Sequence, residues 1–163
     1  MNNRHRPVFI LFAAILLLGC SAKNKFPSDG IDLSLTPQRA VAESAALQNV
    51  PMLWGGVIIS SSNLQDATQF EILAYPLTRE QKPDTEQTPV GRFLAIQEGY
   101  LELSDYAPGR LMTVRGTLQE KRSGRIGKSD YIYPLLNINQ QHLWSTQVQS
   151  KDPQFHFGLG LNF

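Results

Sequence analysis

Between Arg110 and Leu118, apolar and polar side chains alternate along the chain. Every second position carries one set and the positions between carry the other: Met112, Val114, Gly116 and Leu118 against Thr113, Arg115 and Thr117. A period of two residues is typical of a β-strand with one face buried and the other in solvent. The segment therefore predicts a strand that borders a hydrophobic core, and a fold of the mainly β class.

Four more segments predict short strands because they are apolar, rich in β-branched or aromatic residues and bounded by turn residues. Their ranges are 52–60, 70–77, 91–97 and 131–138. Gly55 and Gly56 lie inside the first of them, where glycine indicates a bulge or a close backbone approach. The charged segment 120–129 contains glycine and predicts a turn. The short segment 142–144 is expected to close the core.

Five short strands with glycines near their corners and a connector at 99–108 predict a small five-stranded OB-like barrel. A β-sandwich is the main alternative. A helix is expected before the first strand, because Thr36 is a good N-cap and Pro37 suits the first helical position. Helix formers continue over 40–48, so we expect a short helix that ends before Pro51.

The first 19 residues have the pattern of an export signal. Arg4 and Arg6 give a basic start, and residues 8–18 form an apolar run without a charge. A membrane-spanning helix needs about 20 apolar residues, so this run is too short to span a bilayer. We therefore expect residues 1–19 to be a cleaved signal peptide.

The run ends in Leu17-Leu18-Gly19-Cys20, which resembles a bacterial lipobox. A cysteine thiolate is nucleophilic enough to take a diacylglyceryl group as a stable thioether. The resemblance implies cleavage between Gly19 and Cys20 and acylation of the new amino group. Cys20 is the single cysteine of the chain, so it can form no internal disulfide.

Two or three fatty chains on one residue would hold the protein on a membrane, because one myristoyl-length chain already gives reversible binding. Ser21 follows the cysteine, where an aspartate would imply retention at the inner membrane. The resemblance to lipobox proteins therefore implies transfer to the cell outer membrane, with the domain on its periplasmic face. The expected partners are the lipid bilayer and the machinery that processes and sorts lipoproteins.

These features predict four parts: a signal peptide at 1–19, a lipidated tether at 20–35, a β-barrel domain at 36–145 and a C-terminal tail at 146–163. Lys and Arg number 15 against 14 Asp and Glu, and removal of Arg4 and Arg6 with the signal leaves a net charge of −1. A nearly neutral chain argues against nucleic acid as a partner, which requires a basic surface. The tail alternates and ends in Phe163, so we expect it to dock on the domain or to contact the bilayer.

A series of short motifs follows in order through this domain. They are Trp54-Gly55-Gly56, Glu71-Ile72-Leu73, Tyr75-Pro76-Leu77, Gly91-Arg92-Phe93-Leu94-Ala95, Pro108-Gly109-Arg110, Tyr131, Tyr133-Pro134 and His142-Leu143-Trp144. The series resembles the Slp family of outer-membrane lipoproteins, which is associated with starvation and stress in Gram-negative bacteria. The resemblance runs from about Cys20 to Trp144. It implies a location and an architecture, and no catalytic residues.

Aromatic side chains supply the candidate ligand groove. Its members share a place on or beside a predicted strand: Trp54, Tyr75, Tyr131, Tyr133 and Trp144. OB folds often bind oligosaccharides on one face, and aromatic rings suit sugars or peptides. The other interpretation is a packed barrel core with hydroxyl groups at its rim.

Charged and polar residues suggest no catalytic or metal site. Arg92, Arg110 and Arg115 are expected to pair with nearby acidic residues rather than to bind phosphate groups. A structural zinc site needs about four ligands, and the mature chain has two histidines and no second cysteine. No cofactor is expected, apart from the acyl chains on Cys20.

These observations predict a non-enzymatic outer-membrane lipoprotein that acts in envelope maintenance or stress response. Two alternatives remain open. The first is a binding module for peptidoglycan or another envelope glycan, and the second is a subunit that recruits a protein partner in the envelope.

Overall fold

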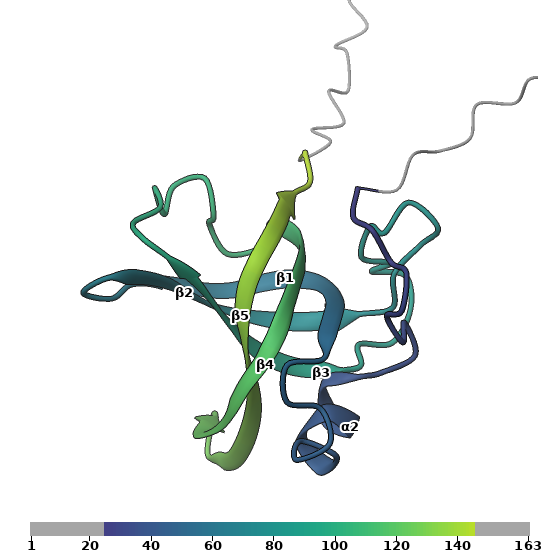
Figure 1. The fold of residues 1–163 in the computed structure, drawn as a ribbon. Helices are drawn as coiled ribbons and strands as arrows, with labels where there is room; N and C mark the ends of the chain where they lie inside the picture. The colour runs from purple at the N-terminus through teal and green to yellow at the C-terminus, as the bar shows by residue number, and fades with distance from the viewer. Residues whose placement is uncertain (1–24, 146–163) are drawn as a thin grey trace, which may run out of the picture.

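A computed structural model describes residues 25–145 of the chain (Figure 1). Within this range the chain forms one short helix and five strands: α2 (Pro37–Ala42), β1 (Pro51–Asn63), β2 (Ala67–Tyr75), β3 (Gly91–Glu98), β4 (Leu111–Ile126) and β5 (Ser129–Leu143). The prediction of a mainly β fold with a short preceding helix is confirmed. The signal peptide, Cys20 and the C-terminal tail lie outside the described residues.

The strands close into a barrel in the order β1-β2-β3-β5-β4. Neighbouring strands are antiparallel except β3 and β5, which are parallel from Leu94 and Leu135 to Ile96 and Asn137. β1 pairs with both β2 and β4, so it closes the sheet. This is the arrangement of an OB-like barrel, as predicted, and a closed barrel rules out the alternative of two stacked sheets.

Alternate residues of each strand fill the interior of the barrel. β2 shows the pattern most fully, because every second residue from Thr68 to Ala74 is buried and the residues between are half-buried. Aromatic and aliphatic side chains from all five strands meet in one core, whose largest members are Trp54, Phe70, Phe93, Met52, Ile58, Ile72, Met112 and Leu136. The indole of Trp54 packs edge-on against Phe93, with the ring centroids 5.2 Å apart.

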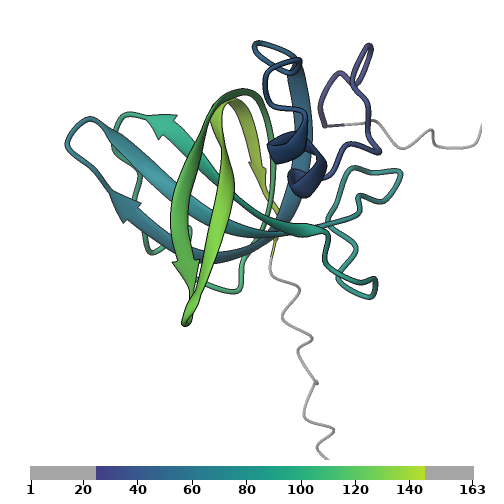
Figure 2. The same cartoon turned by 90° about the horizontal axis from the view of Figure 1, so that it is seen from below.

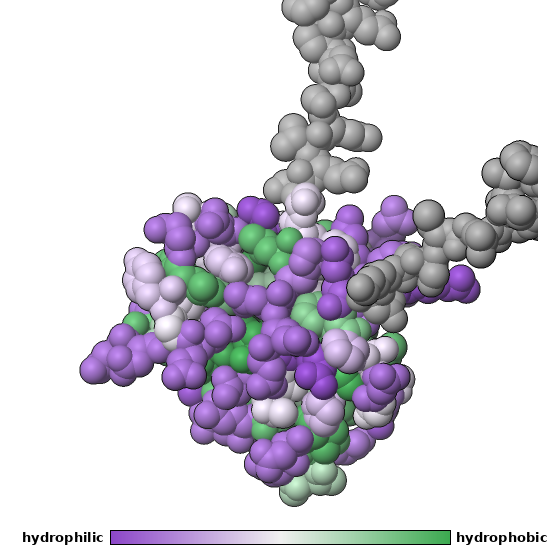
Figure 3. Space-filling view, turned by 45° about the horizontal axis from the view of Figure 1, so that its top comes forward, coloured by the Kyte–Doolittle hydropathy of each residue, from purple (hydrophilic) through white to green (hydrophobic). Residues whose placement is uncertain are grey.

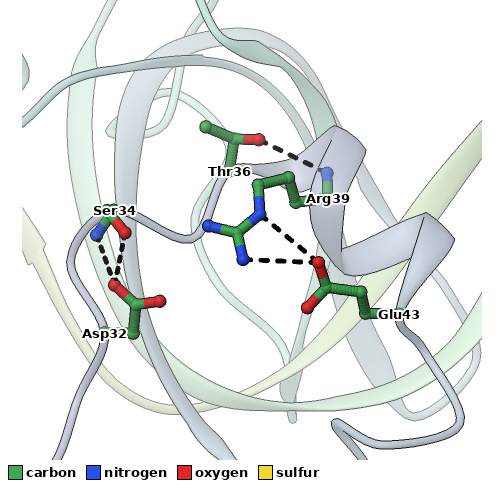
Figure 4. A network of polar contacts seen from close by, with 5 residues as sticks. All are labelled: Asp32, Ser34, Thr36, Arg39 and Glu43. Atoms are coloured by element: carbon green, nitrogen blue, oxygen red, sulfur yellow. Dashed lines mark hydrogen bonds and ion pairs between the residues drawn. The ribbon is translucent and has the colours of Figure 1, made fainter.

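α2 begins as expected but is shorter than the run of helix formers. The hydroxyl of Thr36 accepts a hydrogen bond from the backbone N–H of Arg39, and the guanidinium of Arg39 pairs with Glu43 one turn later (Figure 4). The prediction that the helix continues over 40–48 is wrong, because regular helix ends at Ala42. Asn49 takes a left-handed conformation with φ of 62°, which turns the chain into β1.

The predicted turn at 120–129 is also wrong. β4 continues to Ile126 and β5 begins at Ser129, so the turn comprises two residues, and Gly127 supplies the positive φ of 60° that it needs. The end of this hairpin projects beyond the rest of the barrel (Figures 1 and 2). Both of its faces are largely in solvent, so its side chains are charged and resemble those of a loop.

Residues 25–35 pack on the barrel. Phe26 and Leu35 are buried, and the carbonyl of Leu35 accepts a hydrogen bond of 2.7 Å from the indole N–H of Trp54. The interpretation of this stretch as a free tether therefore does not hold for Phe26–Leu35, because both apolar side chains are removed from water. The two ends of the described chain, Lys25 and Ser145, lie at the same end of the molecule (Figure 1).

Candidate functional site

The five aromatic residues of the predicted groove occupy three separate places. Trp54 is in the core, and it borders a pocket of about 190 Å³ together with Tyr75 and the segment from Leu33 to Pro37. Tyr131 and Tyr133 form a second group, and Trp144 stands at the end of β5 beside His142. The structure therefore brings them together only in part, as two pairs and one separate residue.

Tyr131 and Tyr133 belong to a small polar and aromatic cluster on the outside of the barrel. Their rings meet edge-on at 4.7 Å, and the hydroxyl of Tyr133 donates to Glu71 at 3.2 Å. The guanidinium of Arg92 donates to the same carboxylate oxygen at 2.7 Å, which confirms the expected pairing of Arg92 with an acidic residue. Burial, and then the negative charge of Glu71, raise the pKa of Tyr133 above its usual value.

Trp144 lies at the mouth of the barrel, between two open pockets. Its indole N–H donates to the hydroxyl of Thr113 at 2.9 Å, and the ring of His142 packs perpendicular to it with a centroid distance of 4.6 Å. One pocket has a volume of about 370 Å³ and the other about 500 Å³. Lys82 and Trp144 line both of them. Burial, and then the charge of Lys25, lower the pKa of His142 below its usual value.

Gln81 joins the segments that meet at this mouth. It is 4% exposed, and its amide makes two hydrogen bonds with the backbone of Phe26, one from N–H and one to the carbonyl. Its own carbonyl accepts from the hydroxyl of Thr113 at 2.7 Å. The start of the described chain, the 76–90 connection, β4 and Trp144 after β5 are thus linked by two buried polar residues, Gln81 and Thr113. Sequence reasoning missed Gln81, because nothing around it distinguishes it from the polar residues of an exposed loop.

Replacement of Thr113 by valine tests this link. Valine keeps the shape of threonine but removes the hydroxyl that donates to Gln81 and accepts from Trp144. We expect a loss of about 2 kcal/mol in the free energy of unfolding, because two buried polar groups lose their partner. Urea denaturation of the chain from Ser21 onward, followed by circular dichroism, measures it. Thr117→Val on the same strand is the control, and an equal effect of both changes would contradict the role of the hydroxyl.

The other two arginines do not pair with carboxylates within residues 25–145. Arg110 donates to the backbone carbonyls of Asp105 at 3.0 Å and Trp144 at 3.4 Å. The Nε atoms of Arg110 and Arg115 are buried without a hydrogen-bond partner in the described part of the chain. The expectation that these two side chains pair with acidic residues is therefore wrong, since Arg110 binds main-chain oxygens instead.

Within the described residues the structure offers no group of three or more His, Cys, Asp or Glu side chains that could hold a metal ion. The three buried polar side chains of this range, Thr68, Gln81 and Thr113, are all used in hydrogen bonds to nearby segments. No helix between residues 25 and 145 is long and apolar enough to cross a membrane.

Similar proteins point to the cell envelope. The chain is 30% identical over 150 residues to the outer membrane protein Slp of Escherichia coli strain K12, with 87% of this chain and 76% of that protein covered. It is 29% identical over 161 residues to the uncharacterized lipoprotein YeaY of the same organism, with 90% and 79% covered.

Solved structures add little to this. A small single-stranded DNA-binding protein from Streptomyces coelicolor aligns with a TM-score of 0.35 and 12% identity, over 58% of this chain and 93% of that chain. Similarity at that level supports no argument about function.

The family model described as "Outer membrane lipoprotein Slp family" matches residues 17–159, which include Leu17-Leu18-Gly19-Cys20 and the whole barrel. A match over most of the chain, together with the relative at 30% identity, is sufficient to assign it. The chain therefore belongs to the Slp family of outer membrane lipoproteins.

Proposed function

We propose that the protein is anchored by an acylated Cys20 to the periplasmic face of the outer membrane, where it contributes to envelope maintenance or stress response without catalysis. The observation that carries the proposal is the family match, which begins at Leu17 and so includes the lipobox-like residues up to Cys20. A lipobox cysteine of this family would bear a diacylglyceryl group and an amino-linked acyl chain. The lipid is the anchor that the proposal requires, and the barrel is the exported domain.

The position of the described ends agrees with such an anchor. Lys25 lies five residues after Cys20, and Phe26 is fixed to the barrel by Gln81. Five extended residues span at most about 18 Å. A lipid on Cys20 would therefore hold one defined end of the barrel near the membrane, because the segment between them is short.

A non-catalytic role is supported by the hydrogen bonds of the buried polar residues. The interior is filled with apolar side chains, and the buried polar residues of the described range serve to join segments. The five aromatic residues of the predicted groove do not line a common surface. We therefore do not propose glycan binding as the function.

Replacement of Cys20 by alanine tests the anchor. We expect the wild-type protein to incorporate labelled palmitate in a Gram-negative host and to fractionate with the outer membrane, because two or three acyl chains bind essentially irreversibly. The Cys20→Ala protein should incorporate none and should leave the outer-membrane fraction. Ser21→Ala is the matched control and should behave as the wild type. Palmitate labelling of Cys20→Ala at the wild-type level would contradict the proposal.

The same strains test the cellular role. Cells that lack the protein should survive envelope stress less well, and the wild-type gene should restore survival where the Cys20→Ala gene does not. Restoration by both genes would show that the cellular role does not require the lipid anchor.

A further inference from the structure

The two pockets beside Trp144 have an excess of positive charge. Their ionisable lining residues are three basic side chains, one imidazole and one carboxylate: Lys25, Lys82, Arg110, His142 and Glu80. The ion pairs found within residues 25–145 involve none of the three basic side chains. Glu80 accepts a hydrogen bond from Thr78 at 2.9 Å, within its own turn. The three basic side chains therefore have no carboxylate as an ion-pair partner in this range.

Arg110 is held in a fixed orientation at the smaller pocket. Two of its guanidinium nitrogens are fixed by the carbonyls of Asp105 and Trp144, which orient the side chain. Its Nε–H is buried and has no acceptor within the described residues. The guanidinium contributes its positive charge to the wall of the smaller pocket, and this charge attracts a phosphate group. Lys82, which lines both pockets, adds a flexible point charge.

Trp144 gives this mouth the chemistry of a membrane interface. Its N–H is bonded inward to Thr113, and the rest of its half-buried ring lines both pockets. Tryptophan is favoured where one edge of the ring is packed and the other meets lipid headgroups. Figure 3 shows the molecule with this end tilted toward the viewer, and its surface is mainly hydrophilic with separate hydrophobic areas. A surface of this kind suits headgroups rather than the hydrocarbon core.

The segment that connects Cys20 to the barrel reaches the barrel beside these pockets. Lys25 lines the larger one, and Cys20 lies five residues earlier, within about 18 Å of extended chain. A ligand presented by the same bilayer has a high effective concentration here, so weak individual contacts suffice. The opposite end of the molecule, where β4 turns into β5, has no such proximity (Figure 1).

We propose that the two pockets around Trp144 bind the phosphate of anionic phospholipid headgroups in the leaflet that holds the anchor, and so orient the barrel with this mouth toward the membrane. The proposal depends on the lipid anchor at Cys20. The shared ligand chemistry is a phosphate monoanion, and the source to which we commit is the lipid.

The test uses the full lipidated protein, purified from membranes and reconstituted in vesicles of phosphatidylcholine, with or without phosphatidylglycerol. An amine-reactive reagent labels exposed lysines, and mass spectrometry quantifies each site. We expect labelling of Lys82 to fall several-fold when phosphatidylglycerol is present. Labelling of Lys128, in the β4–β5 turn at the far end, should be the same in both vesicles. Equal labelling of Lys82 in both would overturn the proposal.

Matched charge reversals provide a second readout. Addition of phosphatidylglycerol should shift the fluorescence of Trp144 in the wild type and in Lys128→Glu, and the shift should be lost in Lys82→Glu. Trp54, the other tryptophan, is 5% exposed in the core and should not respond. A shift that persists in Lys82→Glu would also overturn the proposal.

Three further outcomes distinguish the source of the phosphate and separate failure of the headgroup site from failure of the anchor. Protection of Lys82 by inorganic phosphate, with phosphatidylcholine vesicles, would assign the pockets to a free anion and overturn the lipid assignment. Protein that stays on the vesicles with unchanged Lys82 labelling leaves the anchor intact and removes only the headgroup site. If the native protein purified from membranes proves to carry no acyl chains and is released from both kinds of vesicle, the anchor itself is contradicted.

Discussion

Replacement of Gly56 by alanine should destabilise the barrel by about 3 kcal/mol, which is the upper part of the range for an overpacked core. A Cβ atom at this position would overlap the carbonyl oxygen of Leu73 and lie 2.6 Å from its carbon and 2.9 Å from the Cα of Ala74. All three are backbone atoms of β2, so no side chain can rotate to relieve the clash. The strand itself would have to move.

The position of Gly56 explains the size of the expected effect. It pairs with Ala74 of β2 on one side and with Met112 of β4 on the other, so β1 is held between two ladders. A displacement from β2 would strain the pairing with β4, through which the barrel closes. Thermal unfolding of the chain from Ser21 onward should show the midpoint lowered by roughly 10 °C.

Ser62→Ala is the control for this change, because it introduces alanine at an exposed position of the same strand without adding a heavy atom. We expect its midpoint to stay close to that of the wild type. If Gly56→Ala unfolds at the wild-type temperature, the close approach of β1 and β2 is not present in solution.

Replacement of Trp54 by alanine should cost about 4 kcal/mol, as is usual for removal of a large aromatic side chain from a core. The indole is 5% exposed and packs against Phe93. Its N–H donates to the carbonyl of Leu35, so the change also releases the segment that leads toward Cys20. Urea denaturation followed by circular dichroism measures the loss.

Trp54→Phe separates the two contributions. Phenylalanine keeps an aromatic ring against Phe93 but cannot donate to Leu35, so we expect a smaller loss of about 2 kcal/mol. Proteolysis near Leu35 should become faster in both variants, because the segment is no longer bonded to the core. Equal stability of Trp54→Phe and the wild type would show that the hydrogen bond contributes nothing.

The strands that face the core could be predicted because their burial appears in the sequence. Val114 and Leu118 point inward from β4, and each is followed by a residue with a more exposed side chain, whereas Met112 is followed by Thr113, which is also buried. The role of Gly56 was also predictable in kind, since a glycine within an apolar strand indicates a bulge or a close approach. The partner of that approach, Leu73, was not predictable because it comes from another strand.

The sequence-based predictions are wrong where the sequence shows no pattern of buried and exposed residues. Residues 120–126 form a strand that is largely in solvent on both faces, so charged residues there have no apolar partners to reveal a period of two. The helix was overestimated because propensity continues past Ala42, whereas Asn49 and the pairing of Gln48 with Leu118 turn the chain toward β1. The aromatic groove failed as a single surface because rings on different strands face different sides of a closed barrel.

By itself, the sequence determined where the five strands lie along the chain, the alternation of β4 and the resemblance that the family match confirms. Periodicity and local motifs depend on residues that are close together in the chain, so they can be recognised from the sequence alone. Tertiary structure alone decided that Gln81 joins Phe26 to Thr113, that Phe26 is buried, and that Lys25, Lys82 and Arg110 surround Trp144. These groups are distant in the chain, and closure of the barrel brings them to one mouth.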